Sequence, residues 1–369
     1  MAAAGIAVSV SAGVMKPLLE KLTKLMGNEY KKLKGLRKEP QDLINKIIGY
    51  LQDMRYFIIV DDLLMVATKS SLTEIVDVPS LSHLSTYWLA GRMRLPDGID
   101  KVKSLRSLGT FCLEESSLEN IMSVGELTDL RELLFRWCNG KKGVVAMPMA
   151  IAALITCLEK LGNLRVLHLL STKTFCCGDA MLEPIFSPPF YKIEELYLNQ
   201  LMFSSVPRWI GHLRCLRELD LQAKHIFQED INIIGTRLTS LFRLFLRMVH
   251  VPTERLVIGC STGFKVLKLF YFDCDGVSCL TFEAGAMPNL QVLRLAIDPE
   301  EWDKATPVGL QHLPSLKILG LSVEPDVDVF GTAAEEVMTD VFQKAADALP
   351  TRPAVEIDQG SRLEEWRVT

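Results

Sequence analysis

The sequence predicts an α/β fold, a solenoid with a curved parallel sheet, an N-terminal helical segment and a C-terminal capping helix. Between residues 105 and 321 a six-residue pattern, here called the phrase, recurs. It consists of an apolar residue, two residues of any type, a leucine, one residue of any type and a final apolar residue. Successive copies begin about 23 to 34 residues apart. A hydrophobic content of 49% is enough for a sizeable core.

The clearest copies are the six-residue stretches 164–169, 193–198, 216–221, 241–246, 264–269, 290–295 and 316–321. Two looser copies precede them at Leu105 and Leu130. Each phrase predicts a short strand whose alternate apolar side chains point into a shared core. One strand cannot bury such a face alone, so neighbouring repeats must stack. This period with this phrase is the leucine-rich repeat signature.

Composition argues against several classes of protein. The net charge of −4 argues against general binding of nucleic acid. No apolar run reaches the roughly 18 residues of a membrane span, so we do not expect membrane association. The nine cysteines form no Cys-x-x-Cys pair, and the chain has no Asn-x-Ser/Thr acceptor. Both features favour a reducing, cytoplasmic location.

The first 40 residues predict an amphipathic helix. Apolar residues recur at near-helical spacing from Val8 to Leu33, with Lys and Glu on the other faces. The dipeptide Glu39-Pro40 marks a boundary, because the residue before a proline avoids helical geometry.

An apolar strand ending in two carboxylates follows this helix. After a helical pattern at 42–51, the stretch from Arg55 to Leu63 predicts a strand buried in a parallel sheet. Asp61 and Asp62 lie at its carboxyl end. An acidic pair at the carboxyl end of a strand is where nucleotide-binding folds hold magnesium.

These N-terminal stretches resemble the plant coiled-coil, nucleotide-binding (NB-ARC), leucine-rich-repeat (NLR) disease resistance proteins of the grass type. Residues 7–25 resemble the first helix of an Rx-type coiled coil, and residues 51–63 are similar to the kinase-2, or Walker B, motif. The resemblance implies that Asp61 belongs to a magnesium site and that Asp62 has a catalytic or water-positioning role.

The phosphate loop of that family, Gly-x-x-x-x-Gly-Lys-Ser/Thr, does not occur in the sequence. We therefore expect a truncated member, with most of the coiled-coil and NB-ARC regions missing. A lone Walker B strand has no neighbouring strands and no anion site. Asp61 and Asp62 are then a vestigial, inactive motif, and no cofactor is expected where the intact family binds ADP or ATP.

The predicted organisation has five parts: a partial coiled-coil helix at 1–40, an NB-ARC remnant at 41–66, a lead-in region with a degenerate repeat at 67–104, leucine-rich repeats at 105–330, and a C-terminal cap and tail at 331–369. The degenerate repeat is Leu81–Leu84. A capping box at Thr332–Glu335 opens a helix that runs to Leu349, and Val355–Ile357 predicts a last strand. Together they would close the end of the solenoid.

No catalytic or metal-binding residue is predicted, and we do not expect an enzyme. The stretch from Gly259 to Gly263 matches the Gly-x-Ser-x-Gly nucleophile elbow around Ser261. That elbow requires a strand, a sharp turn and a helix, whereas this stretch leads into a repeat strand, so we interpret it as a loop. The six histidines stand singly, without a metal-binding spacing.

The concave face of the sheet is the predicted binding surface. Side chains between and after the last two apolar positions of each phrase should point away from the core. Aromatic and basic residues on one surface are typical of protein-binding hot spots. The alternative is a misjudged register, or cover by a neighbouring element. The predicted partner-binding residues are Tyr197, Asn199, Asp220, Phe245, Arg247, Lys268, Phe270 and Arg294.

We therefore expect a leucine-rich-repeat module for protein interaction in the plant defence response. The resemblance implies as partner a pathogen effector, a guarded host protein or another NLR. Two alternatives stay open: an immune switch that binds ADP or ATP, and a non-functional truncated product.

Overall fold

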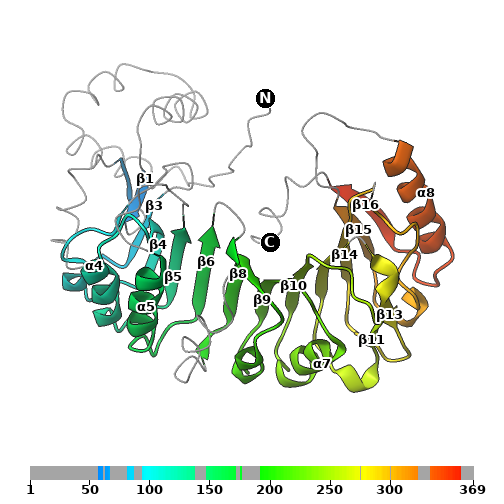
Figure 1. The fold of residues 1–369 in the computed structure, drawn as a ribbon, viewed down its shortest axis with the longest axis horizontal. Helices are drawn as coiled ribbons and strands as arrows, with labels where there is room; N and C mark the ends of the chain where they lie inside the picture. The colour runs from blue at the N-terminus through cyan, green and yellow to red at the C-terminus, as the bar shows by residue number, and fades with distance from the viewer. Residues whose placement is uncertain are drawn as a thin grey trace, which may run out of the picture.

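The computed structural model describes residues 57–60, 63–66, 81–86, 94–137, 147–171, 175–176, 192–274, 276–299, 301–322 and 333–358. Over these residues the chain forms an arc. Strands line its inner, concave side, and helices lie along its outer, convex side (Figure 1).

One sheet of 14 strands runs through the described part of the chain. Its parallel strands follow chain order and are β3 (His83–Thr86), β4 (Ser107–Cys112), β5 (Glu132–Trp137), β6 (Val166–Ser171), β8 (Glu195–Phe203), β9 (Glu218–Ala223), β10 (Arg243–Met248), β12 (Leu269–Asp273), β14 (Val292–Ala296), β15 (Ile318–Ser322) and β16 (Ala354–Asp358). The short β7 (Phe175–Cys176) pairs with β8 outside this order. The predicted curved parallel sheet is confirmed, including the strand of the degenerate repeat and the last strand.

The parallel strands from β5 to β15 contribute alternate residues to one continuous core. On β9, Leu219 and Leu221 are fully buried, and they pair in register with Leu244 and Leu246 of β10. This alternation follows from the two-residue period of a strand. The core therefore consists of the inward leucines of successive repeats, as the phrase requires.

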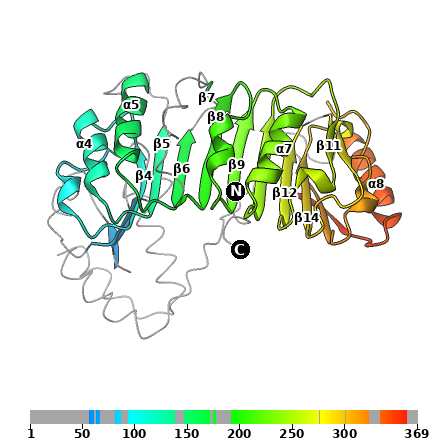
Figure 2. The ribbon, with the colours of Figure 1, turned by 90° about the horizontal axis from the view of Figure 1, so that it is seen from below.

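The convex side carries short helices and a second, small sheet (Figure 2). The helices are α4 (Leu118–Ser123), α5 (Met147–Leu158), α7 (Gln228–Arg237) and α8 (Ala333–Asp347), with 3-10 turns at Ile99–Lys101, Val124–Glu126, Arg208–His212, Cys260–Thr262, Val277–Cys279 and Leu310–His312. The small sheet pairs β11 (Leu256–Ile258) in parallel with β13 (Leu280–Phe282). Across the ranges that the structure describes, none of the helices has the length and apolar content to span a bilayer.

The predicted capping helix at the C-terminal end is confirmed as α8. Its Met338 and Phe342 are fully buried, and the Phe342 ring lies 5.8 Å from that of Trp302. The strand β16 continues the parallel sheet beside β15.

The N-terminal end of the sheet differs from the prediction. The strand β1 (Phe57–Val60) pairs antiparallel with β2 (Leu63–Val66), with Val60 opposite Leu63, and antiparallel with β3. The expectations of a parallel-sheet strand and of a strand without neighbours are both wrong. An edge of a sheet offers unpaired backbone groups, and β1 and β2 extend the sheet at that edge. The helix predicted for residues 1–40, together with Asp61 and Asp62, lies outside the described residues.

Candidate interaction surface on the concave face

The strand register sorts the concave side chains into columns. The central column holds the residue between the two inward positions of each strand. Its members are Leu134, His168, Tyr197, Asp220, Phe245, Tyr271, Arg294, Gly320 and Glu356. The outer column, two residues further along each strand, includes Gln222, Arg247 and Asp273.

One repeat lies three residues away from its predicted register. Phe245 pairs with Tyr271, and Phe270 pairs with Leu244, so the inward residues of β12 are Phe270 and Phe272. The expected concave position of Phe270 is therefore wrong: this ring is fully buried, 5.8 Å from that of Phe272. Tyr271 takes the place in the central column that was predicted for Lys268.

The register of this repeat was mispredicted because phenylalanine replaces leucine within its copy of the phrase. Phe264 has a φ of 54°, is buried, and ends the turn before the repeat, so it matches the position of Leu213 and not that of Leu216. The stretch 267–272 also fits the phrase, but phenylalanine replaces leucine at its inward positions. Lys268 lies one residue before β12 and is exposed.

Asn199 does not continue the outer column. The register between β8 and β9 shifts after Leu198, and Met202 is the residue that pairs with Gln222. Asn199 belongs to β8, but its side chain lies outside what the structure describes. A bulge of this kind leaves no trace in the repeat phrase, because it follows the last inward residue.

The predicted exposure is wrong for most of the central column. Tyr197, Phe245 and Arg294 are each 2% exposed, and Asp220 is fully buried. Adjacent strands lie only about 4.8 Å apart, so large side chains in one column cover one another. The rings of His168 and Tyr197 lie 4.0 Å apart, for example.

Ion pairs link the buried charges of the concave face. The Tyr197 hydroxyl donates to Glu218, which also pairs with Arg243. Arg247 pairs with Asp220 of the neighbouring strand.

Two further pairs extend the same pattern toward the C-terminal end. Arg247 approaches Asp273 at 4.0 Å and lies 5.1 Å from the centre of the Tyr271 ring. At the far end of the column, Arg294 pairs with Glu356 at 3.2 Å. Buried charges need partners of this kind, because an unpaired charge in a protein interior is costly.

Burial shifts the proton affinity of two groups in this surface. Burial raises the pKa of the half-buried Glu195 carboxyl, and the charge of Glu218 adds to the effect. The pKa of the Tyr197 hydroxyl is also raised, first by burial and then by its hydrogen bond to Glu218. The hydroxyl therefore stays protonated and donates to Glu218.

The surface that a partner can reach consists of half-buried side chains. They include Gln222 and Glu195, and also Arg247, Arg243 and Asp273 with side-chain exposures of 13%, 20% and 32%. Acidic, basic and amide groups alternate over short distances, and ion pairs hold Arg243, Arg247 and Asp273 in place. Chemically this is a platform of mixed charge for polar recognition.

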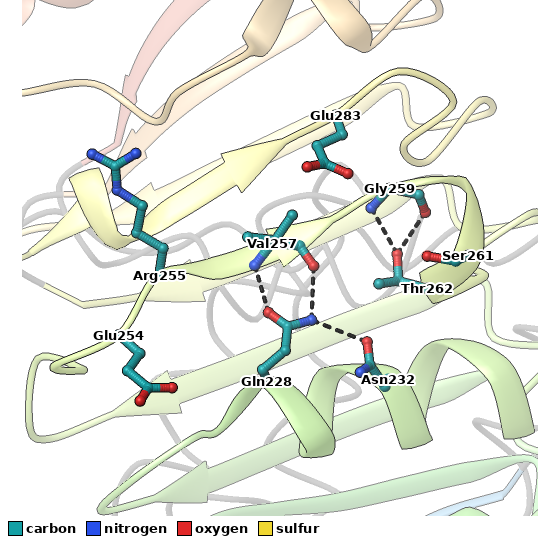
Figure 3. A pocket seen from close by; sticks show the side chains of 9 residues that line it. All are labelled: Gln228, Asn232, Glu254, Arg255, Val257, Gly259, Ser261, Thr262 and Glu283. Atoms are coloured by element: carbon teal, nitrogen blue, oxygen red, sulfur yellow. Dashed lines mark hydrogen bonds between the residues drawn. The ribbon is translucent and has the colours of Figure 1, made fainter.

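A shallow polar pocket of about 350 Å³ lies on the convex side, between α7 and the small sheet (Figure 3). The Gln228 side-chain amide accepts from the Val257 N–H at 2.6 Å and donates to the Val257 carbonyl oxygen at 2.8 Å. It thereby satisfies backbone groups on the free edge of β11. The Thr262 hydroxyl accepts from the Gly259 N–H at 2.9 Å and donates to its carbonyl oxygen at 2.6 Å.

The Gly-x-Ser-x-Gly stretch beside this pocket lacks the geometry of a nucleophile elbow. Ser261 is exposed within a 3-10 turn, and the positive φ of 88° belongs to Gly263. The turn leads through Phe264 into the next repeat and not into a helix. Within the described residues there is no group of three or more His, Cys, Asp or Glu that could hold a metal ion.

Comparison with known proteins agrees with this architecture. The family model described as "Leucine-rich repeat region" matches residues 18–355. The rice Disease resistance protein RGA5 is 31% identical over 283 residues, which cover 75% of this chain and 24% of RGA5. The rice Disease resistance protein Pikm1-TS is 29% identical over 173 residues, which cover 46% of this chain and 14% of that protein.

The chain thus spans about a quarter or less of the length of these relatives. Among solved structures, an LRR protein of Leptospira interrogans covers 79% of this chain and is itself covered to 98%, at 15% identity and a TM-score of 0.32. At that score the superposition is weak, and the fold rests on the strand register described above.

Proposed function

The chain belongs to the leucine-rich repeat family and is an NLR-like module homologous to rice disease resistance proteins, and on this premise we propose that its concave face binds a protein in a plant defence response. One observation carries the proposal. From β9 to β12 the concave columns form a charge-paired surface on which ion pairs hold Arg243, Arg247 and Asp273 in place. Curved repeat solenoids use such extended surfaces for binding proteins.

The chemistry of the platform favours a folded, polar partner. Arg247 and Asp273 present opposite charges a few ångströms apart, so a partner must supply complementary charges at matching positions. A pathogen effector, a guarded host protein or another NLR are the proposed partners. We further propose a cytoplasmic location, no ADP or ATP as cofactor, and no catalytic activity of its own.

The test is binding by the full chain in plant cells. The tagged chain is expressed in rice protoplasts, captured partners are identified after cross-linking, and the strongest is purified for titration. Asp273→Ala and Gln222→Ala should each weaken its binding roughly tenfold, which corresponds to about 1.4 kcal/mol. Lys344→Ala, on the convex α8, should leave the affinity unchanged. Equal affinity of all three variants would contradict the concave assignment.

The nucleotide-switch alternative has a separate test. Titration of the purified full chain with ADP and magnesium should give no binding heat and no shift in melting temperature, because the phosphate loop motif is absent from the sequence. Saturable binding that is lost in Asp61→Asn would support a switch in place of the proposed module.

A further inference from the structure

A row of basic side chains lies along one rim of the arc, where the strands begin. Each residue of this strand-start row donates its N–H to the carbonyl oxygen of its counterpart in the preceding repeat, at 2.7–2.9 Å. From β4 to β15 the row reads Arg106, Arg131, Arg165, Glu194, Arg217, Phe242, Lys268, Gln291 and Lys317. Its six cations are all exposed.

The C-terminal part of this row has uncompensated charge. In the N-terminal part, Arg165 pairs with Glu194 at 2.7 Å. Within the described residues, Arg217, Lys268 and Lys317 make no ion pair, and the Lys268 ammonium lies 4.8 Å from the centre of the Phe242 ring.

Two further exposed cations lie in the turns that lead into this part of the row. Arg214 precedes Arg217 by three residues, and Lys265 precedes Lys268 by the same distance. We call Arg214, Arg217, Lys265, Lys268 and Lys317 the basic rim. Its five positive charges contrast with a chain whose net charge is −4.

The basic rim is narrow, which limits what it can bind. Just inside it, on the concave face, lies the half-buried carboxylate of Glu195, while the cation of Arg243 is already paired with Glu218. On the opposite rim Asp298 is exposed two residues after the end of β14, and the exposed Glu301 and Asp303 follow it in the loop. A wide polyanion, such as a nucleic-acid duplex or an anionic bilayer, would meet these carboxylates. A single extended chain can follow the line of cations alone.

The spacing of the cations along the row determines where a partner must place its negative charges. Arg217, Lys268 and Lys317 occupy every second position of the row, with Phe242 and Gln291 between them. Two strand spacings amount to about 10 Å. A polypeptide in the extended polyproline II conformation advances about 3.1 Å per residue with three residues per turn, so every third side chain faces the same way at nearly the same interval.

Recognition must use side chains, because the backbone groups along the row already pair from repeat to repeat. We propose that the basic rim binds an extended acidic polypeptide segment with a carboxylate at every third residue. This surface is distinct from the concave platform. Opposite charges along one line favour fast, salt-sensitive association.

The test uses the full chain and a labelled peptide of 13 residues with Glu at positions 1, 4, 7, 10 and 13 and Ser or Gln elsewhere. Fluorescence anisotropy at about 50 mM salt should show saturable binding that weakens at least tenfold by about 300 mM salt. The triple variant Arg217→Gln, Lys268→Gln, Lys317→Gln should bind at least tenfold more weakly. The peptide with its five Glu residues adjacent at one end should bind at least threefold more weakly.

A matched control removes three cations elsewhere, by Arg94→Gln, Lys304→Gln and Lys344→Gln, and should bind within twofold of the parent chain. Circular dichroism confirms that both triple variants fold. An equal loss in the two triple variants, or no saturable binding, would overturn the proposal. So would tighter binding of a 13-nucleotide single-stranded DNA or of phosphatidylserine vesicles through the same three cations. Gln222→Ala should leave peptide binding unchanged, which separates this test from that of the concave face.

Discussion

The side chain of Phe270 distinguishes the two registers of β12, because they place this ring in opposite surroundings. In the structure it is fully buried among inward residues, beside Phe272. Removing a buried phenylalanine ring to alanine costs about 3–5 kcal/mol, from lost burial and the cavity left behind. On an exposed concave position the same change would cost about 0.5 kcal/mol or less.

The assay is urea unfolding of the full chain, followed by circular dichroism and tryptophan fluorescence. Phe270→Ala should lower the unfolding midpoint by about 1 M urea or more, given slopes of a few kcal/mol per molar. Lys268→Ala is the matched control, since its side chain is exposed, and should shift the free energy of unfolding by less than about 1 kcal/mol. Since repeat proteins can unfold in parts, hydrogen exchange of β12 supplies a local readout. If the free energies of unfolding of Phe270→Ala and Lys268→Ala differed by less than about 0.5 kcal/mol, the register of β12 described here would be refuted.

Three further predictions concern backbone strain, proton binding and thiol reactivity. Gly309 has a φ of 81°, and a Cβ there would lie 1.9 Å from the Phe282 carbonyl oxygen, so Gly309→Ala should destabilise the fold by more than about 1 kcal/mol in urea. Gly162→Ala, which meets nothing within 4 Å, should not destabilise it, and equal midpoints for the two variants would contradict this backbone geometry. Because the pKa of Glu195 is raised in the folded state, that state binds the proton more tightly, and stability is lost as the pH rises through the raised pKa. Glu195→Gln should therefore gain stability relative to the parent chain between pH 4 and pH 7, and a difference that is independent of pH would argue against the raised pKa. Burial raises the pKa of the Cys157 thiol to about 12, so iodoacetamide at pH 8 should modify the exposed Cys215 and Cys260 well before Cys157, as peptide mass spectrometry would record.

The repeat phrase predicted the strands because its physical requirement is local. A leucine pair such as Leu219 and Leu221 can be buried only on one face of a strand, and stacking then follows from the period. The capping helix was predictable for a similar reason, since its capping box and the following Pro350 delimit it in the sequence. These features depend on neighbours within a few residues.

The concave surface was harder to predict because it depends on pairing between repeats. The three-residue shift at Phe264 changed which side chains face outward, and the bulge of β8 removed Asn199 from its column. The burial of Asp220 and Arg294 follows from partners on other strands, Arg247 and Glu356. No pattern within one repeat contains that information.

The sequence by itself determined the architecture of this protein, since a leucine phrase repeated in register can bury its apolar face only by stacking into a parallel sheet. The tertiary structure alone decided the character of the surface. It placed β1 antiparallel at the open edge, moved Lys268 from the concave face to the basic rim, and paired the buried charges across strands. The physical reason is that the burial of apolar residues depends on neighbours within a few residues of sequence. Exposure and charge pairing arise between strands that are about 25 residues apart in sequence but about 4.8 Å apart in space.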